Sequence, residues 1–146
     1  MPILGYSLKS IVAERKGNPV GRIDISSTPL IKTVEERTVN ILGKQTALGI
    51  TFEFETEYKP DVAKIKMSGE LLFASEDSKK ILKDWKKEKK LPEKIDIEIK
   101  NFLFRKCLGL GLSISEELQL PPPILFPIII PKEKQEEKEK KTEYIG

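Results

Sequence analysis

The fold is decided by residues 48–58, LGITFEFETEY. Apolar side chains occupy alternate positions from Leu48 to Phe54 and return at Tyr58, while Gly, Thr and Glu fill the positions between them. This period of two, together with its aromatic content, predicts a β-strand that buries one face and leaves the other in water. The glutamates of the wet face are opposed by lysines of the following segment, so we expect a solvated face there and no metal site.

The residues that follow predict the partner of this strand. Residues 59–61, KPD, form a turn signal, and apolar residues alternate again over 63–73. One register satisfies both faces of the hairpin and gives the pairs Tyr58–Ala63, Glu57–Lys64, Glu55–Lys66 and Phe54–Met67. Gly69 then falls opposite Phe52, where the missing side chain leaves room for the ring or for a bulge.

Two further strands are expected before this hairpin. They cover residues 8–16 and 22–38, and Pro29 in the second indicates an edge, a bend or a break. Residues 40–46 are the expected connecting loop. Four strands joined mostly by hairpins predict an antiparallel sheet.

Two helices are expected after the sheet. Residues 76–90 form a lysine-rich segment with a narrow apolar stripe, made by Ile81, Leu82 and Trp85. Pro92 is suited to open the second helix, over 95–119. Its apolar residues recur at helical spacing, at Ile95, Ile99, Phe102, Leu103, Cys107, Leu110, Ile114 and Leu118. Phe104, Leu108 and Leu112 widen this stripe, so we expect the sheet on one side and a partner subunit or apolar ligand on the other.

The chain ends in two compositionally distinct segments. Residues 120–131, LPPPILFPIIIP, contain five prolines and seven apolar residues, so they are expected to be extended and packed against something. Residues 132–146 carry five Lys and five Glu and are expected to be a disordered tail. We therefore expect a single α+β domain over 1–131, with a four-stranded antiparallel sheet covered by two helices.

The composition excludes several kinds of site. The chain has 146 residues, a net charge of +3, no histidine and one cysteine, Cys107. Catalytic triads, Cys-His pairs and histidine or cysteine zinc sites are therefore excluded. We expect no enzyme, no metal and no cofactor, and we interpret Cys107 as a buried structural thiol because it lies within the apolar stripe. No apolar run reaches ~18 residues and no signal peptide precedes the domain, so a cytoplasmic protein without membrane insertion is expected. The abundance of Lys, Glu and Ile is typical of a thermophile.

A lysine-rich segment, residues 79–94, is the candidate for binding phosphate. Its candidate phosphate-binding residues are Lys79, Lys80, Lys83, Lys86, Lys87 and Lys90, with Trp85 as a stacking ring for nucleic acid. Acidic residues are interspersed, and Trp85 shares its stripe with Ile81. We therefore favour a solvated helix that docks through Trp85.

The order of elements resembles the SecB-like export chaperones, in which four antiparallel strands precede a long helix and an extended, proline-containing segment. Three short motifs carry the resemblance, at residues 69–73 (GELLF), 101–104 (NFLF) and 120–127 (LPPPILFP). The resemblance implies a dimer of dimers with grooves that hold unfolded chains without ATP. Such grooves combine apolar contacts with backbone hydrogen bonds and read little sequence.

The candidate residues for binding non-native polypeptide are Phe52, Phe54, Tyr58, Phe102 and Phe126. Core packing is the competing role for each of them. The leading hypothesis is an ATP-independent holdase-type chaperone that acts as a homo-oligomer, a dimer or a tetramer. The alternatives are a nucleic-acid- or ribosome-associated protein that uses residues 79–94, and a structural subunit of a larger complex.

Overall fold

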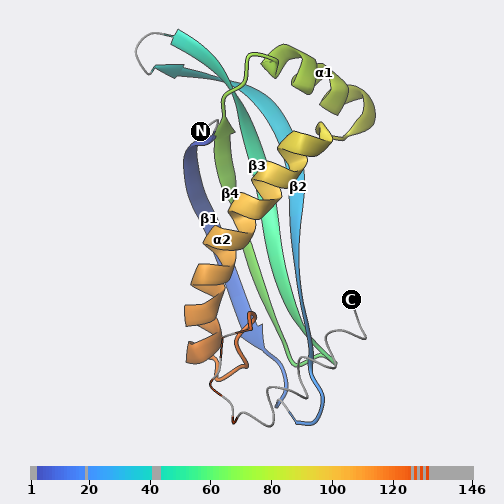
Figure 1. The fold of residues 1–146 in the computed structure, drawn as a ribbon, viewed down its shortest axis with the longest axis vertical. Coiled ribbons are helices and arrows are strands. Elements are labelled where there is room, and N and C mark those ends of the chain that lie inside the picture. The colour runs from blue at the N-terminus through green and yellow to red at the C-terminus, as the bar shows by residue number, and fades with distance from the viewer. Residues whose placement is uncertain are drawn as a thin grey trace.

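The computed structural model describes residues 3–18, 20–40 and 44–125, together with Pro127, Ile129 and Pro131. Its elements are β1 (Ile3–Arg15), β2 (Asp24–Asn40), β3 (Lys44–Lys59), β4 (Ala63–Phe73), α1 (Ser78–Glu88) and α2 (Glu93–Glu117). The strands form one antiparallel sheet in the order β1-β4-β3-β2 (Figure 1). The expected α+β class, with four antiparallel strands and two helices, is confirmed. The consecutive strands β1 and β2 lie at opposite edges of the sheet.

The predicted register of the β3–β4 hairpin is confirmed from Tyr58–Ala63 to Phe52–Gly69. Both reasons that the sequence suggested for a glycine at position 69, room for the Phe52 ring and a bulge, apply in the structure. A Cβ on Gly69 would overlap the carbonyl oxygen of Ser7 and stand 3.0 Å from the Phe52 ring. A register shift between Leu8 and Ser10 of β1 lies at the same point. Gly69 therefore lets β1 approach β4 closely and leaves space for the Phe52 ring on the core side.

The predicted strand limits before the hairpin differ from the observed ones, since β1 extends further towards the N-terminus and β2 is displaced by two residues from the predicted 22–38. β1 begins at Ile3, five residues earlier than expected, and β2 continues without a break through Pro29 to Asn40. Proline is tolerated there because β2 is an edge strand, and the register shift occurs only later, between Ile31 and Thr33. β3 already begins at Lys44, so part of the expected loop over 40–46 belongs to the β2–β3 hairpin.

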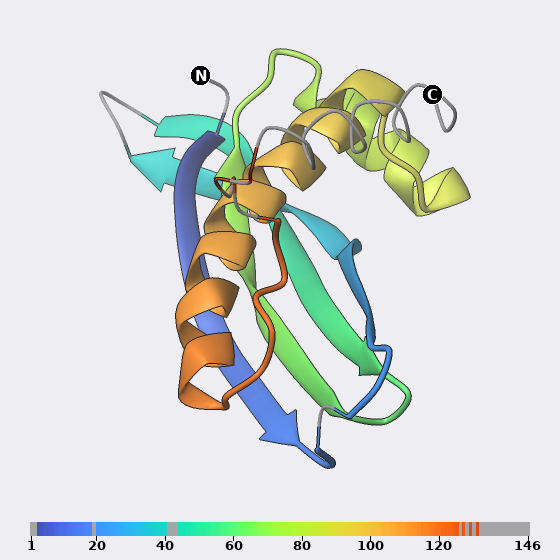
Figure 2. The same ribbon diagram turned by 60° about the horizontal axis from the view of Figure 1, so that its bottom comes forward.

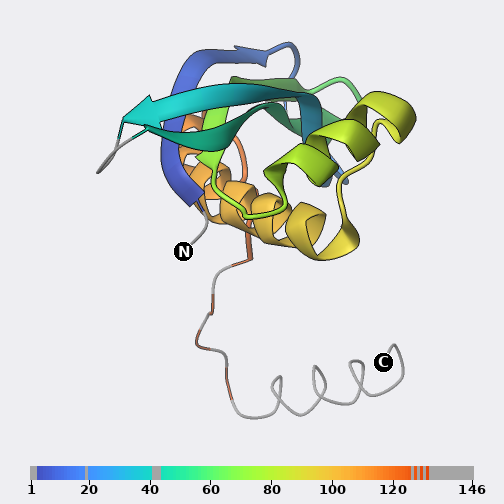
Figure 3. The ribbon, with the colours of Figure 1, turned by 90° about the horizontal axis from the view of Figure 1, so that it is seen from above.

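Both helices cover the same face of the sheet (Figures 2 and 3). The buried residues of α2 follow each other at every fourth position: Ile99, Leu103, Cys107, Gly111 and Ser115. The other residues of the predicted stripe are half-buried and pack against the core, namely Ile95, Phe102, Leu110, Ile114 and Leu118. Rows of side chains four residues apart are inclined to a helix axis, so a helix that crosses a sheet obliquely buries such a row.

α1 is shorter than the predicted 76–90: it ends at Glu88 and is capped by Lys89, which has a left-handed φ of 56°. Its predicted stripe is confirmed for Ile81 and Trp85, which are buried, while Leu82 is half-buried. Pro92 precedes the first turn of α2, as the sequence predicted.

The first part of the proline-rich segment packs against the domain. After α2 the chain turns back alongside the helix (Figure 2). Leu120 is buried, and the Tyr58 hydroxyl donates a hydrogen bond of 2.8 Å to the carbonyl oxygen of Pro121. The expectation of packing was wrong for Leu125 and Ile129, which are fully exposed in this single chain. The tail over 132–146 lies outside the described residues.

The opposite face of the sheet is polar, as the alternation of β3 predicted. Its ion pairs join diagonal neighbours: Lys64 Nζ is 3.0 Å from Glu55, and Lys66 Nζ is 3.5 Å from Glu53. The hydrogen bond from Lys64 lowers the pKa of the Glu55 carboxyl below its usual value. These pairs support the interpretation of this row of glutamates as a solvated face.

Candidate functional site

The free edge of β2 is the first component of the candidate site. Within the described residues β2 pairs along one side only, with β3. Its other side therefore presents backbone N–H and C=O groups that no strand of the described chain satisfies. An edge of this kind can accept an added extended peptide.

A groove lies beside this edge where β2 passes the end of α1 and the start of α2. Its volume is about 440 Å³. We define the β2 groove by its lining residues, which are Pro29, Leu30, Ile31, Trp85, Lys89, Lys90, Leu91, Glu93, Asp96 and Lys100. Pro29, Ile31, Trp85 and Leu91 provide its apolar side chains, and charged residues form most of the rest of the lining. Leu30 lies at its rim, because this residue is opposite Glu53 and belongs to the polar face of the sheet. This combination of apolar and charged lining suits a peptide whose backbone pairs with an edge strand.

The apolar residues of the β2 groove differ in how far they reach the surface. Leu30 is 42% exposed, whereas Trp85 is 8% exposed and offers only a small part of its ring. The ammonium of Lys89 lies 5.9 Å from the centroid of the Trp85 ring. The groove is therefore an apolar strip with cations beside it.

Three of the candidate polypeptide-binding residues lie in the core. Phe52, Phe54 and Tyr58 are each 1% exposed, because α2 and the segment after it cover their face of the sheet. Phe52 stacks on Tyr6 with ring centroids 5.6 Å apart, and Phe54 meets Phe104 edge-on at 5.5 Å. In this chain they serve as packing residues.

The remaining two candidates for binding polypeptide are Phe102 and Phe126. Phe102 is half-buried on α2, where it meets Tyr6 edge-on at 5.6 Å. Arg105 and Lys106 lie over the same ring, at 6.0 and 5.8 Å. Phe126 lies outside the described residues. The four described candidates, Phe52, Phe54, Tyr58 and Phe102, therefore do not line a common groove.

The candidate phosphate-binding lysines lie together on α1 and just after it. All six are exposed, namely Lys79, Lys80, Lys83, Lys86, Lys87 and Lys90. None of the described ion pairs involves any of them. Trp85, the proposed stacking ring, instead faces the core and the β2 groove. The lysines therefore form a cationic surface without an exposed aromatic platform.

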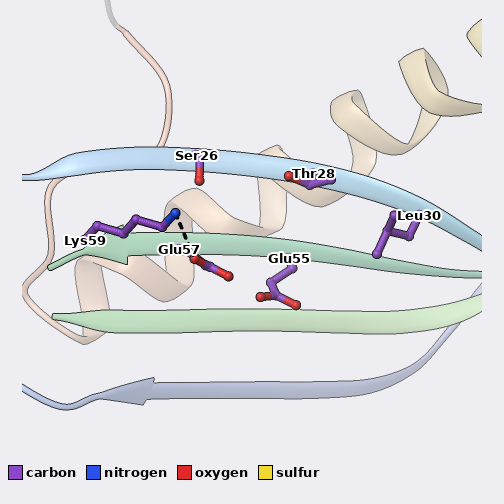
Figure 4. Close-up of a pocket in the computed structure, with 6 residues that line it drawn as sticks. All are labelled: Ser26, Thr28, Leu30, Glu55, Glu57 and Lys59. Carbon is purple, nitrogen blue, oxygen red and sulfur yellow. Dashed lines mark ion pairs between the residues drawn. The ribbon is translucent and has the colours of Figure 1, made fainter. Parts of the chain in front are cut away.

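A second hollow lies on the polar face of the sheet (Figure 4). Its volume is about 270 Å³, and its lining residues are Ser26, Thr28, Leu30, Glu55, Glu57 and Lys59. Lys59 pairs with Glu57 at 3.7 Å. In the part of the chain that the structure describes, no three Asp, Glu or Cys side chains are placed to hold a metal ion.

The buried thiol of Cys107 contacts a tyrosine. The Tyr6 hydroxyl and Cys107 Sγ are 3.7 Å apart, and burial raises the pKa of both groups. A thiol with a raised pKa is a poor nucleophile at neutral pH. This environment agrees with the structural role predicted for Cys107.

The sequence missed the apolar lining of the β2 groove. Leu30, Ile31 and Leu91 were not among the candidates, although Pro29 marked β2 as an edge and Leu91 stood between the two helices. The groove joins residues of β2 to residues more than fifty positions later, which a local pattern does not bring together.

No described helix is long and apolar enough to cross a membrane.

The sheet order and the long covering helix define a SecB-like fold. No protein-family model matches the chain, and no curated protein matches it. Among solved structures, the fold is similar to that of the SecB-like chaperone Rv1957 of Mycobacterium tuberculosis, solved in complex with a ChAD peptide from the Rv1956 HigA1 antitoxin. The match has a TM-score of 0.54 and 14% sequence identity, and it covers 88% of this chain and 91% of that chain. The resemblance predicted from the sequence is thus confirmed at the level of the fold.

Proposed function

We propose that this protein is an ATP-independent holdase-type chaperone that binds non-native polypeptide in the β2 groove. The observation that carries the proposal is the free edge of β2 beside an apolar strip. An extended client adds its backbone to that edge, so that its alternate side chains lie against Ile31 and Leu91 on the helix side and beside Leu30 on the polar side of the sheet. Backbone hydrogen bonds are common to all sequences, so the site accepts many clients.

The SecB-like fold supports this proposal, because the matched Rv1957 structure is a chaperone holding a peptide. The proposed function requires no catalytic residue and no cofactor, and we place the protein in the cytoplasm. Phe52, Phe54 and Tyr58 support the groove from the core instead of touching the client. Phe102 and Phe126 remain candidates for additional contacts.

The function is tested by light scattering from an unfolded, aggregating client. A stoichiometric amount of this protein, without ATP, is expected to suppress the scattering, and an inert protein at equal concentration is not. No suppression with several unrelated clients would contradict the proposal.

The β2 groove is tested with one paired substitution and its control. Leu30→Ser combined with Leu91→Ser removes apolar contacts at the groove, and we expect several-fold more protein to be needed for the same suppression. Val20→Ser is the control, because Val20 is 82% exposed and does not line the groove. Equal activity of both variants would place client binding elsewhere.

The backbone contribution is tested with a client peptide and a copy methylated at alternate backbone nitrogens. The copy keeps the side chains and loses the donors needed on one edge, so it is expected to bind more weakly. Equal binding of the two peptides would contradict addition to a strand edge.

We also propose a homo-oligomer, a dimer or a tetramer. The support is exposed apolar surface away from the β2 groove, on β1 at Ile11 and Val12 (46% and 58% exposed) and on α2 at Ile97 (50%). Light scattering coupled to chromatography measures the mass, and a monomer would contradict this proposal.

A further inference from the structure

We propose that the β2 groove selects apolar segments flanked by acidic residues; this inference rests on the proposed function and concerns the class of client. The observation is the juxtaposition of the groove with unpaired lysines. Lys89 and Lys90 line the groove, and the exposed lysines of α1 continue the cationic surface away from it. A client lying along β2 would place residues adjacent to its apolar core near this surface.

The charge of the chain is concentrated at this place. Residues 76–94 contain eight Lys and five Asp or Glu, a surplus of three that equals the net charge of the whole chain. The rest of the sequence is therefore balanced in charge. A local excess of one sign next to a binding groove attracts ligands of the opposite sign and raises their association rate.

The pairing of the lysines differs between the two sides of the sheet. On the polar face Lys32, Lys64 and Lys66 each lie within 3.5 Å of a glutamate carboxylate. Between residues 79 and 94 no lysine makes an ion pair in the described structure. These cations thus remain available for the carboxylates of a ligand.

Two acidic residues also line the groove, and neither removes the cationic excess. Asp96 is paired with Lys100 at 2.9 Å on the first turns of α2. Glu93 and Asp96 lie in the first turn of that helix, where the helix dipole stabilises negative charge. Lys89 and Lys90 are left to face the client.

An acidic polypeptide fits these features better than a nucleic acid. Single-stranded nucleic acid is bound by cations together with exposed rings on which bases stack. Trp85, the aromatic residue of this surface, is 8% exposed and packs in the core. The apolar strip and the free strand edge instead match a peptide with an apolar core and carboxylates beside it.

The test uses three fluorescent peptides that share one apolar, extended core and differ only in flanks of Glu, Ser or Lys. The expected order of affinity for the full-length protein is Glu, then Ser, then Lys. Several weak exposed charge pairs acting together give about a tenfold difference between the extremes at low salt. At about 0.5 M NaCl screening reduces that difference to about twofold.

Matched variants locate the preference. Lys89→Gln combined with Lys90→Gln is expected to reduce the preference for Glu flanks over Lys flanks from about tenfold to about threefold. Lys9→Gln combined with Lys16→Gln removes two exposed charges outside the groove and is expected to leave the preference intact. Equal loss in both double variants would overturn the assignment to the groove.

Each remaining outcome separates the client class from the proposed function. Equal binding of the three peptides would overturn the charge preference and leave the groove standing. Binding of none would contradict the groove itself, and the preference with it. A Glu-flanked peptide whose apolar core is replaced by Ser should bind more weakly than the Glu-flanked peptide with the apolar core. Equal binding of these two peptides, or displacement of the Glu-flanked apolar peptide by single-stranded DNA, would mean a general polyanion surface and would also overturn the proposal.

Discussion

Replacing Gly69 with alanine tests how closely β1 must approach β4. The new Cβ would overlap the carbonyl oxygen of Ser7 and stand 3.0 Å from Leu8 Cα and from Phe52 Cζ. Two of these contacts are backbone atoms of β1, so the strand itself must move. We expect β1 to loosen next to the register shift between Leu8 and Ser10.

The magnitude follows from two opposing effects. Overpacking of a filled site lowers the free energy of unfolding by about 1–3 kcal/mol. Replacing a glycine also lowers the entropy of the unfolded chain, which raises the free energy of unfolding by about 0.4–1 kcal/mol. Gly69→Ala is therefore expected to lower the free energy of unfolding by about 1–2 kcal/mol. In a domain of this size the corresponding fall in Tm is about 3–8 °C.

Urea unfolding followed by the fluorescence of Trp85, the single tryptophan, measures this change. Gly5→Ala is the control, because its Cβ would meet two atoms of the Leu72 side chain, at 3.7 and 4.0 Å, which are ordinary contacts. Its stability is expected to be unchanged or slightly raised. A Gly69→Ala protein as stable as the wild type, or an equal loss in both variants, would refute the steric reasoning.

Three further predictions concern the core, pH and the tail. Leu103→Ala leaves a cavity beneath α2 and is expected to cost about 2–5 kcal/mol, whereas Ile97→Ala on the same helix, at a half-exposed site, stays within about 0.5 kcal/mol by urea unfolding. Burial raises the pKa of the Cys107 thiol, so its contribution to stability is full below the unfolded-state pKa of about 8.5 and is lost as pH rises further. Unfolding midpoints measured from neutral to alkaline pH should fall, and Cys107→Ala should flatten the fall. Deleting residues 132–146 is expected to leave Tm nearly unchanged, and a clear drop would mean that the tail is docked.

The local parts of the fold were predictable from sequence. The β3–β4 hairpin was predicted down to single pairs because a period of two, a turn signal and complementary charges all agree on one register. The same agreement placed Gly69 against Phe52. The start of β1 and the exact ends of β2 were harder to predict, because irregularities after Leu8 and Ile31 interrupt the alternation.

The candidate site was the least predictable part. Alternating aromatic residues such as Phe52 and Phe54 indicate only that one strand face is apolar. Whether that face meets a helix or a ligand depends on where α2 lies, and α2 covers it. The β2 groove depends on Leu30 and Leu91 being brought together by the tertiary fold, and neither residue stands out from its neighbours in sequence.

The position of β1 across the sheet from β2 bears on how the chain folds during its synthesis. β2, β3 and β4 are joined by short hairpins and can pair in the order in which they emerge. β1 is made first, yet Tyr6 pairs with Leu71, 65 residues further along the chain. At roughly 5–20 residues per second, the ribosome needs several seconds to deliver that partner. Until β4 arrives, the nascent chain therefore carries β1 without the partner strand that satisfies its backbone N–H and C=O groups.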